Sequence, residues 1–224
     1  MELTLTEENY LKAIYHLSNG GKKEVSTNTL AEELHTRPAS VSDMIRKLNQ
    51  KEVITYEKYQ GVNISDAGKE EALKVIRKHR LWEVFLVSKL GFSWDEVHEV
   101  AEQLEHIKST LLIRRPDEFL GHPRYDPHGD PIPDEKGRIF DHGQIPLTDL
   151  KERSVGKMIA VKNSSREFLN YMNKIKAHLG AKIEVLDILD FDQSVEISVD
   201  DGKPVLISRE VAENILIKKE DLES

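Results

Sequence analysis

The chain changes character at a segment rich in proline and glycine, residues 121–146. Five prolines and four glycines fall within it, a density that stops regular helices and strands. Before this segment, apolar residues recur at helical spacing, with one short hairpin. After it, apolar and polar residues alternate, as they do in half-buried strands. We therefore predict an α+β chain of several domains, with boundaries at residues 1–65, 66–120 and 147–224 and a linker at 121–146.

The part after the linker is predicted to be a small β-barrel. Three stretches alternate apolar and polar residues, 183–191, 195–201 and 203–208, with a turn at Asp201-Gly202 between the last two. One helix, residues 166–180, interrupts these strands, and Gly180 stands where a glycine commonly ends a helix.

Metal-capable side chains gather in the middle of the chain. His98, Glu102, Glu105 and His106 follow one another at spacings of four, three and one, which places them on one face of a predicted helix. Upstream, a second predicted helix carries two more at the same i, i+4 spacing, His79 and Glu83. One such residue on an amphipathic helix is usually only a solvated side chain. Six of them on two helix faces indicate a metal site.

A helix-turn-helix is predicted near the amino terminus. Ser26 begins a short helix that extends to residue 34, and a second helix starts within three residues, which is helix-turn-helix spacing. Thr36 can cap the second helix, and Pro38 falls in its first turn, where a missing backbone donor is tolerated. This second helix runs to about residue 50, with a buried stripe of Val41, Met44, Ile45 and Leu48.

The opposite face of that second helix suits a DNA groove, because small hydroxyl-bearing residues stand beside cations. The residues after it, 53–65, alternate and turn near Gln60-Gly61, which predicts a two-stranded wing with Lys58 near its tip, able to contact phosphates. An ordinary three-helix packing unit with a hairpin is the alternative. The candidate DNA-binding residues are Arg37, Ala39, Ser40, Ser42, Asp43, Arg46, Lys47 and Lys58.

Composition narrows the class of protein. The 224 residues are 38% hydrophobic and 32% charged, with no apolar run near the roughly 20 residues that a membrane span needs. The first residues show no export signal, so we expect a cytoplasmic protein with no membrane partner. A net charge of −8 argues against a general polyanion binder but not against a local DNA-binding face. The absence of cysteine leaves imidazole, carboxylate, carbonyl and water as ligands, which favours harder cations.

Three short motifs now carry a specific resemblance. RKHRLWE at 77–83, VHEVAEQLEH at 97–106 and PHGDPIP at 127–133 follow a predicted winged helix and precede a predicted β-barrel. In this order, the chain resembles the diphtheria-toxin-repressor family of metal-dependent transcriptional repressors over essentially its full length. The resemblance implies a winged helix-turn-helix, a helical metal-binding and dimerisation domain, and an SH3-like domain. It also implies a homodimer that binds double-stranded operator DNA of metal-uptake genes when a divalent metal is bound.

The resemblance further implies two metal sites. The primary regulatory site would use Glu102, Glu105 and His106, with Asn9 from the first helix. A second site would use His79, Glu83 and His98. The linker and the SH3-like domain would supply further candidates, Asp126, His128 and Glu167.

Three positions depart from the family's pattern and bear on the metal. Asn9 stands where one branch has a methionine and the manganese-responsive branch an aspartate. Glu102 replaces the cysteine of the iron-responsive actinobacterial branch, which favours oxygen-rich coordination and hence Mn²⁺, with Fe²⁺ as the alternative. Lys12 stands where the manganese branch can have an additional glutamate, which weighs against a two-manganese cluster.

Two other classes of function are open at this point. Carboxylates and imidazoles on paired helices also build di-iron enzymes, but those bundles use Glu-x-x-His on two helices, and Gln103 stands at that spacing before His106. No separate catalytic base is visible, so we expect no enzyme. The other alternative is a metal buffer whose winged helix contacts proteins rather than DNA, a class that the acidic net charge favours.

Overall fold

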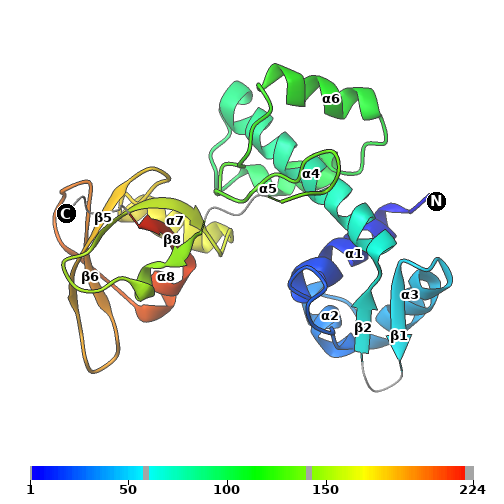
Figure 1. Ribbon diagram of the computed structural model, residues 1–224, viewed down its shortest axis with the longest axis horizontal. Coiled ribbons are helices and arrows are strands. Elements are labelled where there is room, and N and C mark those ends of the chain that lie inside the picture. Colours follow the sequence, from blue (N-terminus) through cyan, green and yellow to red (C-terminus); the bar gives the residue numbers. More distant parts are fainter. Residues whose placement is uncertain (1, 58–60, 140–142, 220–224) are drawn as a thin grey trace. The chain divides into compact units, whose positions relative to one another are not determined.

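The computed structural model describes residues 2–57, 61–139 and 143–219 (Figure 1). The chain forms two compact units. Unit 1 comprises Met1–His79, Glu102–Arg114 and Pro133–Arg138, and unit 2 comprises Arg80–Ala101, Arg115–Ile132 and Ile139–Ser224. The middle helices contribute to both units. No helix within the described ranges is long and apolar enough to cross a bilayer.

Unit 1 begins with the predicted winged helix-turn-helix. Its elements are α1 (Leu5–Leu17), α2 (Thr27–Glu33), α3 (Pro38–Gln50), β1 (Ile54–Glu57) and β2 (Gly61–Ile64). The Ser26 hydroxyl accepts a hydrogen bond from the Thr29 N–H at 3.0 Å, so α2 has the predicted N-cap. Strands β1 and β2 pair antiparallel from Ile54↔Ile64 to Glu57↔Gly61. Lys58 and the greater part of the predicted turn lie outside the described residues.

Helix α3 buries one face and exposes the other. Val41, Ile45 and Leu48 are fully buried and Met44 is half-buried against the same core, so the predicted stripe is confirmed. The predicted cap is wrong by one residue. Arg37, not Thr36, is the N-cap, and it makes no side-chain cap bond, because a guanidinium has no atom that accepts a hydrogen bond. Pro38 at the first helical position pre-orders the turn.

Close packing joins the wing to the next helix. A Cβ on Gly68, in the first turn of α4 (Asp66–Leu90), would lie 1.9 Å from the Val53 carbonyl oxygen. The wing is also bound to the segment before α2, since Val25 and Val62 exchange backbone hydrogen bonds at 3.0 and 2.9 Å. The start of α4 and the winged helix are therefore one packed body.

The helix carrying the predicted metal stripe is shorter than its pattern suggested. Helix α5 spans Val97–Leu104, and Glu105 and His106 lie in the turn that follows it. The prediction of one continuous helix face for all four side chains is therefore wrong. Helix α6 (Thr110–Phe119) then carries Leu111, Leu112 and Phe119 as exposed apolar side chains, and Leu90 is exposed at the end of α4.

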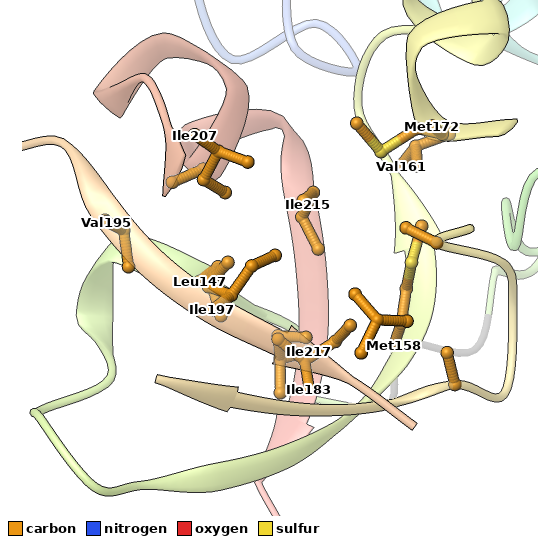
Figure 2. Close-up of a cluster of buried hydrophobic side chains, with 14 of the residues drawn as sticks. Leu147, Met158, Val161, Met172, Ile183, Val195, Ile197, Ile207, Ile215 and Ile217 are labelled. Carbon is orange, nitrogen blue, oxygen red and sulfur yellow. The ribbon is translucent and has the colours of Figure 1, made fainter. Parts of the chain in front are cut away.

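Unit 2 contains a six-stranded antiparallel sheet in the order β3-β8-β4-β5-β6-β7. Figure 2 shows its core, which includes Leu147, Met158, Met172 and Ile183. This confirms the predicted small β-domain. The strands are β3 (Ile145–Pro146), β4 (Val155–Val161), β5 (Lys182–Ile188), β6 (Val195–Val199), β7 (Val205–Ile207) and β8 (Ile215–Lys219), with a short helix at Leu147–Asp149 and helices α7 (Arg166–Lys174) and α8 (Arg209–Asn214).

Helix α7 ends six residues before Gly180. Lys176 takes the left-handed conformation at φ 62°, and the N–H of Ala177 bonds the Met172 carbonyl at 2.9 Å. These are the features of a Schellman C-cap built without glycine. Gly180 is also left-handed, at φ 90°, but it ends a later turn and donates to Met158 at 2.7 Å.

The part of the proline-rich segment around His128 and Gly129 packs against the sheet of unit 2. The Val161 N–H on β4 donates to the His128 carbonyl at 3.0 Å. Gly129 has φ +87°, and a Cβ there would lie 2.0 Å from the Ile159 carbonyl oxygen. Only glycine fits this approach, so the sequence fixes His128 against β4 through its neighbour.

Candidate metal centre and DNA-binding face

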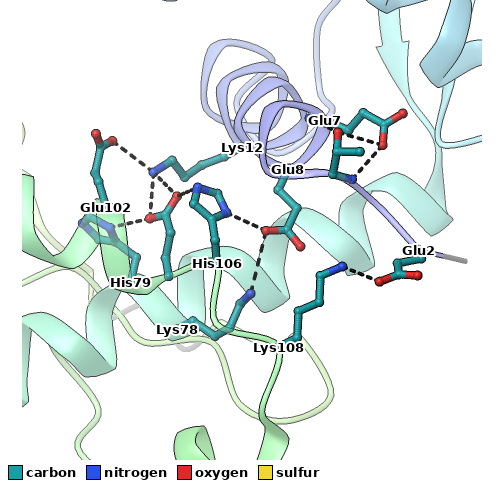
Figure 3. A network of polar contacts seen from close by, with 11 residues as sticks. Glu2, Glu7, Glu8, Lys12, Lys78, His79, Glu102, His106 and Lys108 are labelled. Atoms are coloured by element: carbon teal, nitrogen blue, oxygen red, sulfur yellow. Dashed lines mark hydrogen bonds and ion pairs between the residues drawn. The ribbon is translucent and has the colours of Figure 1, made fainter.

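Two clusters of metal-capable side chains form, one in each unit. The unit-1 cluster combines residues of α1, α4 and the end of α5: Glu8, Lys12, His79, Glu102, Glu105 and His106 (Figure 3). The unit-2 cluster combines α4, α5 and the proline-rich segment: Glu83, His98, Asp126 and His128.

Glu105 is the centre of the unit-1 cluster and its side chain is 0% exposed. Its Oε2 lies 2.6 Å from Nδ1 of His79, and Lys12 donates to both of its oxygens at 2.7 and 2.9 Å. Burial acts to raise the pKa of Glu105, but the hydrogen bond from His79 and the charge of Lys12 outweigh it and hold the pKa below its usual range. A buried, ionised carboxylate at the meeting point of three elements is a strong cation ligand.

His106 connects the cluster to the first helix. Its Nδ1 lies 2.6 Å from Oε2 of Glu8, and its Nε2 lies 3.6 Å from Oε1 of Glu105. Glu8 is only 13% exposed and also has Lys78 at 3.9 Å. The imidazole therefore stands between one carboxylate from α1 and one from the turn after α5; Figure 3 labels His106 and Glu8 of this contact.

Asn9 is the ligand that the sequence predicted from α1. Asn9 is exposed on α1, whereas Glu8, one residue earlier, reaches His106. Sequence reasoning missed Glu8, although the signal was present. Glu8 and Lys12 are four residues apart, so they share one face of α1.

The unit-2 cluster is centred on Glu83, which is 1% exposed. One of its oxygens lies 3.3 Å from Nδ1 of His98 and the other 3.6 Å from Nδ1 of His128. The potential ligand atoms of Glu83, Asp126 and His128 all lie within 4.8 Å of one another. His79 precedes Glu83 by one turn of α4.

His128 is held by groups that favour its charged form. Burial acts to lower its pKa, but the hydrogen bond and charge of Glu83 and the charge of Asp126 outweigh burial and raise the pKa to about 9. Its Nε2 lies 2.8 Å from the Trp94 carbonyl, and its ring stacks on that of Trp94. A metal ion at this cluster would take the place of the imidazolium proton.

Asp126 has a structural task besides any ligand role. Its Oδ1 accepts hydrogen bonds from the backbone N–H groups of His128 and Asp130, at 2.8 and 3.0 Å, and its Oδ2 lies 3.4 Å from Arg80. Burial and the nearby charges of Asp130 and Glu83 raise its pKa to about 7. Asp126 therefore shapes the loop that presents His128.

Glu167, the remaining predicted ligand, is exposed in the first turn of α7 and belongs to neither cluster. The unit-2 cluster fits a divalent cation, because the ligand atoms of Glu83, Asp126 and His128 lie within reach of one ion. The unit-1 cluster offers the same ligand types, carboxylate oxygen and imidazole nitrogen, around Glu105, whose oxygens the Lys12 ammonium contacts.

The candidate DNA-binding residues of α3 all face solvent. Arg37, at the N-cap, and Lys47, in the last turn, are exposed at the two ends. Arg46 pairs with Asp43 across one turn, and Ser42 donates to the Pro38 carbonyl at 3.0 Å. The residues between and beside them, Ala39, Ser40, Ser42, Asp43 and Arg46, are exposed as well.

Comparisons with protein families match three parts of the chain. A model of the iron-dependent repressor N-terminal DNA-binding domain matches residues 2–62. A model of the iron-dependent repressor metal-binding and dimerisation domain matches 65–134, and a FeoA domain model matches 145–219.

Individual proteins agree with these matches. A helix-turn-helix regulator of Methanocaldococcus jannaschii is 34% identical over 113 residues, which cover 50% of this chain and 90% of that protein. The iron-dependent repressor IdeR of Mycobacterium leprae is 33% identical over 168 residues, 71% of each chain. A solved manganese-dependent transcriptional repressor in complex with manganese is 33% identical, with a TM-score of 0.86 over 95% of this chain and 99% of that one.

These matches decide between the classes of function that the sequence left open. The matched family consists of DNA-binding repressors, so the predicted absence of catalysis holds and the di-iron enzyme alternative is set aside. The metal-buffer alternative loses its basis, because residues 2–62 match a DNA-binding domain. The chain belongs to the diphtheria-toxin-repressor family of metal-dependent transcriptional repressors.

Proposed function

We propose that this repressor responds to Mn²⁺ and that the unit-1 cluster is its regulatory metal site. The observation that carries the proposal is the donor set around buried Glu105, which contains carboxylate and imidazole and no sulfur. Such a set suits Mn²⁺ and Fe²⁺ better than softer ions. The similarity to a manganese-dependent repressor favours Mn²⁺, and the similarity to IdeR makes Fe²⁺ the alternative.

In the unit-1 site, Glu102, Glu105 and His106 would hold the ion, with a fourth ligand from α1. Glu8 is the better placed candidate, because its carboxylate already reaches His106 at 2.6 Å. Asn9 is the alternative that the sequence predicted. Substituting each in turn, Glu8→Gln and Asn9→Ala, and comparing Mn²⁺ affinities would assign the position.

In the unit-2 site, Glu83, His98 and His128 would hold a second ion. Asp126 would contribute mainly by holding the His128 loop, since one of its oxygens is already used by two backbone N–H groups. His79 stands one turn before Glu83 and is the further predicted ligand, although its Nδ1 lies 2.6 Å from Oε2 of Glu105. Glu167 has no support from its position on α7.

The proposed coupling of metal to DNA runs through α1. Glu8 belongs to the segment that matches the DNA-binding domain, and Glu102, Glu105 and His106 belong to the segment that matches the dimerisation domain. A bound ion would be held jointly by Glu8 from the first segment and by Glu102, Glu105 and His106 from the second. An ion that binds best to one arrangement of these two segments stabilises that arrangement by its difference in affinity.

The repressor would act as a homodimer on the operators of metal-uptake genes. The exposed Leu111 and Leu112 of α6 fall within the segment that matches the dimerisation domain and are candidates for the dimer contact. The α3 faces of the two copies would then enter successive major grooves.

The test is anaerobic DNA binding to the promoter regions of neighbouring genes with Mn²⁺, Fe²⁺, Zn²⁺ or chelator. We expect Mn²⁺ to tighten binding most. A clear response to Fe²⁺ with negligible Mn²⁺ binding would reverse the order of metals, and no DNA binding with any metal would reject the corepressor mechanism.

A further inference from the structure

Lys12 occupies the position in the unit-1 cluster that a metal ion would need. Its ammonium lies 2.7 and 2.9 Å from the two oxygens of Glu105 and 3.2 Å from Oε1 of Glu102. The side chain is only 16% exposed. Figure 3 shows it pointing from α1 into the same space that Glu102 and His79 face.

The ammonium fulfils the electrostatic role of a cation in the metal-free protein. Glu105 is fully buried, and a buried carboxylate without a positive partner would be strongly destabilising. His79 also bonds Glu105, at 2.6 Å, but an imidazole brings positive charge only when it is protonated. Lys12 brings a positive charge to both oxygens of Glu105, so this buried carboxylate has a partner within the cluster.

A divalent ion and Lys12 cannot use the same oxygens at the same time. Any ion that binds Glu105 must approach the carboxylate edge that the ammonium now covers. Charge repulsion adds to this steric conflict, because an ion beside the ammonium would place like charges a few ångströms apart.

We propose that Lys12 is an internal competitor of the metal. Its ammonium holds Glu105 and Glu102 in the metal-free repressor, leaves when the ion binds, and sets the ion concentration at which the repressor responds. This inference rests on the proposed unit-1 site. It adds that the metal affinity of that site is the result of an exchange between two cations.

The test is a titration of the full chain with Mn²⁺, in which electron paramagnetic resonance measures the concentration of free Mn²⁺ at each step. Three proteins are compared, all carrying His98→Ala to weaken the unit-2 cluster: the otherwise unaltered chain, Lys12→Met, and Lys108→Met. Lys108 is the matched control, because its removal takes the same charge from unit 1; its ammonium bonds Glu2 outside the cluster and acts on Glu8 only through its charge. We expect Lys12→Met to bind Mn²⁺ at least about tenfold more tightly and Lys108→Met to change little.

Thermal unfolding gives a second readout that does not depend on DNA binding. Without metal, Lys12→Met should unfold at a lower temperature, because Glu105 loses its charge partner, and Mn²⁺ should raise its Tm by more than that of the unaltered chain. Lys12→Arg keeps the charge and should bind Mn²⁺ no more tightly than the unaltered chain.

Equal or weaker Mn²⁺ binding by folded Lys12→Met, with normal binding by the unaltered chain, would overturn the competitor role and leave the unit-1 site intact. If neither the unaltered chain nor Lys12→Met bound Mn²⁺, both the competitor role and the proposed unit-1 site would be rejected, because removing the ammonium would then have exposed no metal site. If Lys12→Met does not fold without metal, Lys12→Gln, which can still donate to Glu105, replaces it with the same expectations.

Discussion

The two clusters solve the same problem, a buried glutamate, with different cations. In unit 1, Glu105 is neutralised by the ammonium of Lys12 from α1. In unit 2, Glu83 is neutralised by His128, whose pKa is raised to about 9 by the carboxylates around it. A metal must therefore displace a tethered ammonium in one cluster and a proton in the other.

The two clusters also differ in what they connect. The unit-1 cluster joins the helix that begins the DNA-binding segment to the turn after α5. The unit-2 cluster joins α4 and α5 to a loop fixed on the β-sheet by Gly129 and the His128 carbonyl. The first is thus suited to control DNA binding and the second to fasten the proline-rich segment and the sheet domain.

The largest expected effect comes from Glu105→Ala. This change removes the central ligand of unit 1, so metal should no longer tighten DNA binding, a loss of about 100-fold or more in the metal response. A gel-shift series with and without Mn²⁺ measures it, and sedimentation shows whether the dimer persists, as we expect. A metal response of normal size would remove Glu105 from the regulatory site.

Gly129→Ala should disrupt unit 2 without touching unit 1. Its Cβ would collide with the Ile159 carbonyl, and its backbone is left-handed, so we expect about 3 kcal/mol or more of lost stability. Urea unfolding of the metal-free protein measures the loss. An alanine variant as stable as the unaltered chain would show that the His128 loop does not need this close approach.

His98→Ala should have a smaller and more selective effect. His98 is the most exposed member of the unit-2 cluster, with a side chain 44% exposed, so its removal should be tolerated structurally. We expect metal affinity of the unit-2 site to fall about 10- to 100-fold, while Mn²⁺-stimulated DNA binding changes little. Equal damage to both properties would contradict the division of roles between the clusters.

Sequence patterns predicted the elements well and the cluster memberships only partly. Periodicity located the winged helix and the sheet because the spacing of the apolar residues that are buried on one face can be read from a short stretch of sequence. The stripe of Val41, Ile45 and Leu48 on α3 is an example. Spacing alone could not show that α5 stops at Leu104, because Glu105 and His106 continue the helical pattern after the helix has ended.

Sequence patterns could not predict the contacts between residues that lie far apart in the sequence. Glu8 reaches His106 across 98 positions and Lys12 reaches Glu105 across 93, and neither pairing leaves a local periodicity. Likewise, the ring stacking of Trp94 on His128 follows from the docking of the proline-rich loop on β4. The residue types were visible in the sequence, but their partners depended on the tertiary fold.

The smallest expected effect comes from substitutions on the DNA-binding face of α3, which should change DNA binding without changing metal binding. Lys47 is exposed on α3, whereas Arg46 is partly engaged by Asp43. If Lys47 contacts a phosphate, Lys47→Ala should weaken metal-saturated DNA binding and reduce the slope of log K against log salt by about 0.9, with Mn²⁺ affinity unchanged. Arg46→Ala should reduce the slope less, because Asp43 already neutralises part of its charge. Slopes equal to that of the unaltered chain in both variants would move the C-terminal half of α3 away from the DNA backbone, and a fall in Mn²⁺ affinity would mean that DNA face and metal cluster are not separable.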